Sequence, residues 1–394
     1  MVRVACGVLA LLALAPAVAR ADYEYAGQWP VPSSATGLAV GSGGVYVTRS
    51  SGAFGEQSVR RYSLAGKLLA TWGDPATLTN PSGVATAPDG RVLVSDRFGK
   101  VLTYGADGTF AGQRALTGPC GDELLIKDLD VDRAGDVFVA FYDNCNLVQG
   151  ETRYGVIRAD GAFNVTGVWG QTGAQDGQFN QPVGVASDGH GAVYVADSSN
   201  YRVQRFAPTG VFAGKWGQLG GGRGEFNGLE DVAVSPSGEV FAADRNNERI
   251  QRFSPEGRLL EELRIPGGVR YRGLVTRLDF DAQGRLYALS TGHGTEDEVS
   301  VFVPGSAVTV AKQTLRRRGG RVAVKVACGA VERCTGRLTV RAGKRVLGSR
   351  SYRVAAGKRG VVRVAVRGRL ARRVTVVVTP KGGKPSRRAL TLRY

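Results

Sequence analysis

Short runs in which apolar and polar residues alternate extend along most of the chain, and turns rich in Gly, Asp and Asn separate them. The runs 193–197 (VYVAD) and 202–206 (RVQRF) are typical: each is about five residues long and contains β-branched or aromatic side chains at alternate positions. This pattern predicts short antiparallel strands joined by tight turns, and therefore an all-β fold.

A repeated unit of four such strands organises residues 37–303. Six copies are recognisable, three of them clear and three weaker, and they begin near Gly37, Gly83, Asp128, Gly184, Asp231 and Arg277. A glycine closes the first turn of every copy, at intervals of 47, 45, 56, 47 and 46 residues. Because a period of about 40–50 residues with four strands is typical of a propeller blade, the repeat predicts a six-bladed β-propeller.

The two ends of the repeat region indicate how the ring closes. The sixth copy stops after its third strand, near Val303, whereas Tyr25–Trp29 (YAGQW) near the N-terminus matches the fourth strand Phe212–Trp216 (FAGKW) of the fourth copy. We therefore expect the first strand of the chain to complete the sixth blade, which removes an exposed sheet edge. The tryptophans at 29, 72, 169 and 216 all fall on this fourth strand and are expected to pack in the core.

Two copies carry a family signature. Residues 177–186 (GQFNQPVGVA), followed by Asp197, Asn200 and Arg202, resemble an NHL repeat, and the next copy repeats the pattern with Asp244, Asn247 and Arg249. The resemblance extends over about residues 22–303 and implies a six-bladed propeller, but it implies much less about activity. We expect the recurring Asp to bind loop backbone groups and to pair with the Arg, which is a structural role.

Four cysteines remain if an N-terminal segment is removed: Cys120, Cys145, Cys328 and Cys334. Cys120 lies in the connection that enters the third blade, and Cys145 is expected in the loop between its second and third strands, on the same rim. We predict disulfides between Cys120 and Cys145 and between Cys328 and Cys334, which bracket a five-residue turn, because an even number of cysteines outside the cytosol favours disulfides. The alternative is free thiols.

The last part of the chain, 304–394, has a different pattern. Roughly seven strands of strictly alternating residues follow one another, as in 321–327 (RVAVKVA), and predict a small β-sandwich, immunoglobulin-like or fibronectin-like by analogy. Arg and Lys occupy the positions of the alternation that face solvent, so both outer faces are expected to be basic.

The charge distribution separates these parts. The net charge of +18 is the sum of +2 in residues 1–21, about −8 in residues 22–303 and +24 in residues 304–394, where 25 Lys and Arg accompany one acidic residue. With 43% apolar and 22% charged residues, the chain is typical neither of disordered nor of integral membrane proteins. Residues 1–21 read as a signal peptide, with Arg3 before an apolar segment and a small-x-small site that ends at Ala21. We therefore expect a secreted protein that associates with the cell envelope.

Candidate chemistry is sparse. The chain contains two histidines, His190 and His293, which are expected on opposite rims and cannot form a shared metal site there. The first-strand position that is Gly in three copies is Asp128, Asp231 or Arg277 in the others. Their neighbours on the chain are Lys127 and Glu230. These five residues are the candidate ligand-binding residues at the channel mouth, or alternatively a paired charge ring that fills the channel.

No catalytic, cofactor or metal motif is recognisable. The carboxylates of the channel could hold Ca²⁺, but the neighbouring Arg and Lys argue against a calcium site. The favoured hypothesis is an exported, non-catalytic binding or scaffold propeller with an unknown protein or glycan ligand. Its basic domain would hold it at an anionic cell-wall polymer or lipid surface. The alternative is a propeller lyase or hydrolase, lactonase-like, with its site at the central channel. Specific nucleic-acid binding is disfavoured by the acidic propeller and the signal peptide.

Overall fold

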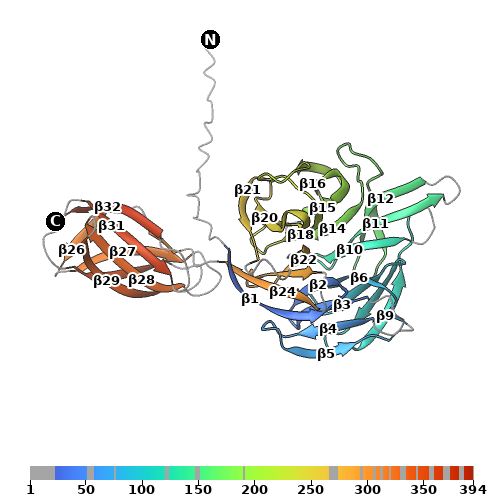
Figure 1. The fold of residues 1–394 in the computed structure, drawn as a ribbon, viewed down its shortest axis with the longest axis horizontal. Coiled ribbons are helices and arrows are strands. Elements are labelled where there is room, and N and C mark those ends of the chain that lie inside the picture. The colour runs from blue at the N-terminus through green and yellow to red at the C-terminus, as the bar shows by residue number, and fades with distance from the viewer. Residues whose placement is uncertain are drawn as a thin grey trace, which may run out of the picture. The chain divides into compact units, whose positions relative to one another are not determined.

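The computed structural model is all-β and divides into two compact units, Tyr23–Val303 and a C-terminal unit that begins at Pro304 (Figure 1). The structure describes residues 23–50, 57–74, 77–119, 124–146, 151–189, 191–265, 274–292, 296–304, 308–310, 314–318, 321–328, 334–342, 345–354, 359–366, 373–380 and 386–393. Within these residues, no helix has the length and apolar character needed to cross a bilayer.

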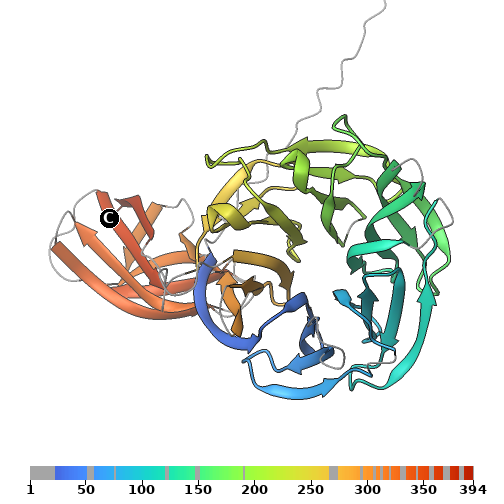
Figure 2. The ribbon, with the colours of Figure 1, turned by 45° about the vertical axis from the view of Figure 1, so that its right-hand side comes forward.

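The first unit is the predicted propeller. Its described strands form six four-stranded antiparallel sheets, which Figure 2 shows arranged in a ring. The first three blades are β2 (Ala35–Gly41), β3 (Gly44–Arg49), β4 (Ser58–Tyr62) and β5 (Leu68–Trp72); β6 (Pro81–Thr86), β7 (Val92–Asp96), β8 (Lys100–Tyr104) and β9 (Phe110–Ala115); and β10 (Leu125–Val131), β11 (Val137–Asn146), β12 (Glu151–Ala159) and β13 (Val165–Trp169).

The second half of the ring follows the same order. These blades are β14 (Pro182–Ser187), β15 (Val193–Asp197), β16 (Arg202–Phe206) and β17 (Phe212–Trp216); β18 (Leu229–Val234), β19 (Val240–Asp244), β20 (Arg249–Phe253) and β21 (Leu259–Leu263); and β22 (Leu274–Phe280), β23 (Leu286–Thr291), β24 (Glu296–Pro304) and β1 (Tyr23–Pro32). Single 3₁₀ turns, Ser198–Asn200 and Arg245–Asn247, follow β15 and β19.

The N-terminal strand closes the ring as the sequence predicts. β1 pairs with β24 and completes the sixth sheet, and the two strands lie side by side in Figure 1. Tyr23 secures the start of β1, because its buried ring packs edge-on against Phe241 and Phe280 and its hydroxyl donates to the carbonyl oxygen of Gly284 at 3.0 Å. Strand β1 therefore contacts the fifth blade as well as the sixth.

The longer repeat interval of the third blade corresponds to a longer hairpin, which β11 and β12 form. β11 and β12 contain 10 and 9 residues, against 5 in each of the equivalent strands β15 and β16. The backbone of Cys145 lies within β11, at a register irregularity between Asn144 and Asn146, and not in a loop as the sequence pattern suggested. Cys120 and the side chain of Cys145 lie outside the described residues, so their pairing stays a prediction.

The four tryptophans pack between neighbouring blades. Each lies on an outer strand with its indole against a glycine of positive φ in the last turn of the next blade. The pairs are Trp29 with Gly66, Trp72 with Gly108, Trp169 with Gly210 and Trp216 with Gly257. A Cβ on Gly257 would lie 2.5 Å from the Trp216 ring, so these positions require glycine for space as well as for backbone conformation. The expected core role of the tryptophans is confirmed.

The recurring Asp and Arg of the fourth and fifth blades form buried ion pairs. Nε of Arg202 lies 2.8 Å from Oδ2 of Asp197, and Arg249 and Asp244 repeat this contact at the same distance. Arg202 also donates to the carbonyl oxygens of Gln175 and Gln178, which belong to the loop that enters the blade. The pair therefore anchors the inter-blade loop, which confirms the expected structural role.

The C-terminal unit consists of eight described strands, one more than the pattern predicted. They are β25 (Val308–Val310), β26 (Thr314–Arg318), β27 (Arg321–Cys328), β28 (Cys334–Ala342), β29 (Arg345–Val354), β30 (Arg359–Ala365), β31 (Arg373–Pro380) and β32 (Ser386–Arg393). β27 pairs with β25 and β30, whereas β28 pairs with β29 and β31. β26 hydrogen-bonds to both groups, antiparallel to β27 and parallel to β32.

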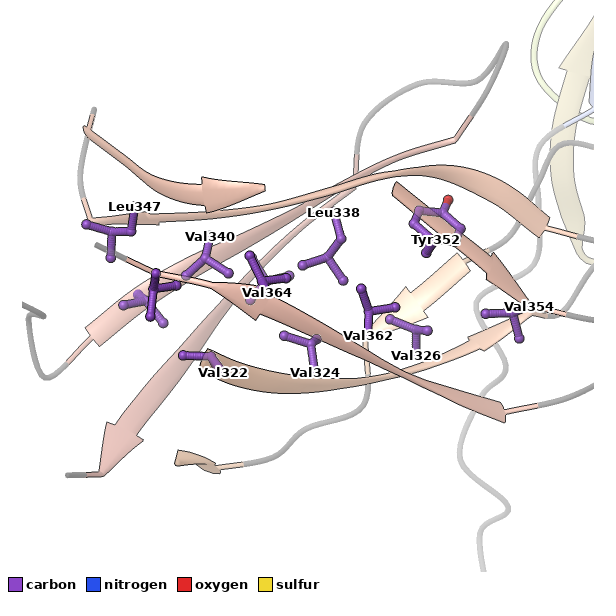
Figure 3. Packing of buried hydrophobic residues seen from close by; sticks show 13 residues of the cluster. Val322, Val324, Val326, Leu338, Val340, Leu347, Tyr352, Val354, Val362 and Val364 are labelled. Atoms are coloured by element: carbon purple, nitrogen blue, oxygen red, sulfur yellow. The ribbon is translucent and has the colours of Figure 1, made fainter. Parts of the chain in front are cut away.

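The core of this unit lies between the two groups of strands (Figure 3). Val324 of β27 and Val362 of β30 are paired, buried neighbours that face Leu338 and Val340 of β28. The intervening positions point outward, so the exposed residues include Arg321, Lys325, Arg337, Arg345, Arg350, Arg353 and Arg363. The backbones of Cys328 and Cys334 end β27 and begin β28, but their side chains lie outside the described residues.

Candidate functional site at the central channel

The innermost strand of each blade lines the propeller channel, and two cavities occur along it. One cavity, of about 380 Å³, lies at the start of these strands. The other, of about 340 Å³, lies toward their ends and the turns that follow. Arg277, on the inner strand β22, lines both cavities and therefore lies between the two halves of the channel.

The first cavity, which we call the mouth, contains three of the five candidate residues. Lys127, Glu230 and Arg277 line it together with the loop residue Arg97. The guanidinium of Arg277 donates to three backbone carbonyl oxygens, those of Thr276 at 2.8 Å, Glu230 at 3.4 Å and Lys127 at 3.5 Å. These bonds fix Arg277 across the inner strands of three blades.

The second cavity contains the other two candidates, Asp128 and Asp231. Five further aspartates line it. Two of them, Asp130 and Asp279, lie two residues after a candidate position, on the same face of its strand. The sequence reasoning missed both, although the two-residue period of a strand places them on the channel side.

Four of these aspartates, which we call the channel carboxylates, bind the backbone of the neighbouring blade. Each accepts a hydrogen bond from an amide on the exposed edge of the next inner strand, which has no partner strand on that side. The Oδ2···N distances are 3.0 Å from Asp128 to Val185, 2.7 Å from Asp130 to Ser187, 2.7 Å from Asp231 to Leu278 and 2.6 Å from Asp279 to Val40. In the part of the chain that the structure describes, none of these carboxylates forms an ion pair with Arg277 or Lys127. The ring of carboxylates is therefore not the ring of paired charges that the sequence allowed as the alternative.

Burial dominates the electrostatics of this ring. It raises the pKa of Asp128 to about 6, although the positive charge of Arg277 opposes the shift. Burial, reinforced by the nearby Asp130 and Asp128, raises the pKa of Asp279 to about 8. The pKa of Asp231 is also raised by burial and by the charge of Asp128. The ring thus retains protons near neutral pH because several carboxylates share one desolvated channel.

Glycine at the equivalent position of other blades leaves room for these carboxylates. A Cβ on Gly184 would lie 2.5 Å from Oδ1 of Asp231, and one on Gly83 would lie 2.8 Å from the Leu129 side chain. Gly83 and Gly184 thus leave space for side chains that the inner strand of the following blade inserts.

The structure does not describe the two histidines, His190 and His293. The described residues contain no group of three or more His, Cys, Asp or Glu side chains placed to hold a metal ion. Arg97 is a mouth residue that the sequence reasoning missed, because it lies in a loop 30 positions before Lys127 and no local pattern marks it.

Comparisons with known proteins agree with this fold. The NHL repeat family model matches residues 179–206 and 226–253, so the predicted resemblance of the fourth and fifth blades is confirmed. No curated protein sequence was found to match the chain.

Solved structures show the same propeller architecture. A gluconolactonase from Xanthomonas campestris is similar over 72% of this chain and 96% of its own, with 16% identity and a TM-score of 0.51. A luciferin-regenerating enzyme is similar over 70% and 95%, with 14% identity and a TM-score of 0.52. At these identities the similarity shows a shared fold.

Proposed function

We propose that this chain is an exported binding propeller that its basic C-terminal sandwich, of the immunoglobulin-like kind, holds at an anionic surface of the cell envelope. The observation that supports the anchor is the outward position of basic side chains on the sandwich, including Arg321, Lys325 and Arg363 on the paired strands β27 and β30. One face of a small module thus presents several cations, and the residues from 304 onward include a single acid, Glu332.

The ligand of the propeller would bind at the channel rather than react there. This is supported by the role of the carboxylates, whose oxygens accept hydrogen bonds from backbone amides of neighbouring blades. A carboxylate held in this way stabilises the ring and is less available to coordinate an ion or to transfer a proton.

Binding of the full chain to phosphatidylglycerol-containing vesicles tests the anchor. The triple variant R321Q/K325Q/R363Q should bind on the order of 100-fold more weakly than the unaltered chain, because each basic residue contributes about 1 kcal/mol at an anionic surface. The matched control K67Q/K100Q/R114Q removes three exposed charges from the propeller. Equal losses in both variants, or binding that is indifferent to salt, would overturn the anchor.

The second candidate function is a lactonase-like hydrolase or lyase. It is favoured by Asp128, whose pKa of about 6 is suited to proton transfer and which lines a cavity of about 340 Å³. The names of the structural neighbours also fit an enzyme of this fold. An activity that disappears in Asp128→Ala or Asp231→Ala, while the variant still folds, would establish the enzyme over the binding protein.

A further inference from the structure

The mouth of the channel contains more positive charge than the protein itself neutralises. Arg97, Lys127 and Arg277 converge on it from the second, third and sixth blades. Among the described residues that line the cavity, Glu230 is the single carboxylate, and it pairs with Arg245, with 3.3 Å between Nη1 and Oε1. None of the three cations forms an ion pair within the described part of the chain.

Lys127 experiences this excess directly. It is half-buried, and its Nζ lies 5.3 Å from the centre of the Tyr142 ring, which holds the ammonium group through a cation–π contact. Burial lowers the pKa of Lys127, and the charges of Arg97 and Arg277 lower it further. An anion in the mouth would raise the pKa of Lys127 again, because it would supply the opposite charge that the site lacks.

Arg277 is prepared to take part in such a contact. Its Nη atoms are fixed by the carbonyl oxygens of Thr276, Glu230 and Lys127, while its Nε is buried without a hydrogen-bond partner in the described structure. The guanidinium is therefore ordered before any ligand arrives, which reduces the entropic cost of binding.

Most of the remaining wall residues are small and polar, whereas Ala35, Pro81 and Ile126 are apolar. Hydroxyl or amide side chains line the cavity between the cations: Thr36, Ser50, Asn80, Ser82, Thr276 and Thr291. Several of these hydroxyls donate to protein acceptors, as Thr36 does to the carbonyl oxygen of Pro81 at 2.8 Å. Their oxygens can still accept hydrogen bonds, so the wall suits a ligand that carries hydroxyl groups beside its charge.

We propose that the mouth binds a small oxyanion, a carboxylate or a phosphate, between Arg97, Lys127 and Arg277. This inference rests on the proposed binding function and gives the chemical class of its ligand. Arg97 can present a planar fork that matches both oxyanions, and Lys127 adds a point charge. Arg277, whose Nη1 is engaged by backbone carbonyl oxygens, contributes mainly its charge. The cavity volume of about 380 Å³ limits the ligand to a small molecule.

Calorimetric titration of the full chain with inorganic phosphate and, separately, with succinate tests the site at constant ionic strength. Arg97→Gln and Lys127→Gln should each weaken binding at least tenfold, since each removes one charge-assisted contact. Arg114→Gln is the matched control, because Arg114 is an exposed residue on the outer strand of the same blade as Arg97. The basic sandwich is present in every variant, so its contribution cancels. Equal affinities in all variants would overturn the proposal.

Chemical protection provides a second measurement. Limited acetylation of lysines, followed by peptide mass spectrometry, should show Lys127 protected by whichever anion binds, whereas the exposed Lys67 should react equally with and without it. Protection by phosphate alone or by succinate alone would identify the type of oxyanion. Unprotected Lys127 in a chain that still binds anionic vesicles would reject the mouth site and leave the anchor intact. Protected Lys127 in a chain that fails to bind vesicles would do the reverse.

Discussion

Asp279 on the inner strand of the sixth blade accepts a hydrogen bond from the backbone amide of Val40 in the first blade, 239 positions away in the sequence, with 2.6 Å between Oδ2 and N. At the outer side of the same junction, β1 completes the sixth sheet. The ring is thus closed twice, by strand pairing at its periphery and by a carboxylate at its channel.

Loss of the Tyr23 side chain should open the outer closure. Tyr23→Ala removes the packing against Phe241 and Phe280 and the hydrogen bond to Gly284, so the free energy of unfolding should fall by about 3–5 kcal/mol. Tyr25→Ala, in the same strand but half-exposed, should cost clearly less. Urea denaturation followed by fluorescence measures both, and equal effects would contradict the special role of Tyr23. Deletion of residues 22–30 should destabilise the whole ring and promote aggregation.

The channel carboxylates should make stability depend on pH. The pKa of Asp279 is raised to about 8 in the fold, so the native state keeps a proton that the unfolded chain has lost above about pH 4. Stability should therefore fall as pH rises from about 4 to 8, and Asp279→Asn should flatten this slope in melting temperatures. The control Asp107→Asn changes an exposed turn and should leave the slope as it is. A slope unaffected by Asp279→Asn would reject this assignment.

Breaking a buried NHL ion pair should be costly. Arg249→Gln leaves Asp244 buried without its charge partner, and we expect a loss of about 3–5 kcal/mol in the free energy of unfolding. Arg258→Gln removes an exposed arginine from the same blade and should change stability little. Guanidinium denaturation compares them, and a loss shared by both variants would show that the buried pair is not the cause.

The disulfide prediction concerns exported protein. Peptide mapping without reduction should find Cys120 joined to Cys145 and Cys328 joined to Cys334, and the first bridge should contribute about 3 kcal/mol of stability. A bridge between Cys328 and Cys334 would link β27 to β28, which belong to different groups of strands in the sandwich. Free thiols or a pair that joins the two domains would contradict the prediction.

Local patterns were sufficient to predict the blades. Strand alternation and turn glycines recur within each repeat, and the match between Tyr25–Trp29 and Phe212–Trp216 was enough to assign β1 to the sixth blade. The same reasoning placed Asp197 beside Arg202, because the two residues stand on adjacent strands of one blade. The strands and the Asp–Arg pair depend on neighbours within one repeat, whereas the position of β1 followed from the comparison of one repeat with another.

The channel could be predicted only in part. The positions Asp128, Asp231 and Arg277 were found because they depart from the repeat, and they do line the channel. Their partners were not found, since a carboxylate that binds a backbone amide of the next blade leaves no trace in the sequence of that amide. Arg97 was missed for a related reason: loop length and ring curvature, not periodicity, bring it to Lys127.

Because the first strand belongs to the last blade, the ring can close only late in folding. Five blades can form from contiguous segments as soon as each has been synthesised, whereas β1 must wait for β24, which follows it by more than 260 residues. The chain therefore contains one pairing of very long sequence separation among many of short separation, and this pairing sets a late step with a large loop-closure cost. Until β24 has been synthesised, β1 has no partner strand, and until the two pair, the edge of β24 is also open. The interval before ring closure is therefore the period in which the chain is most exposed to aggregation.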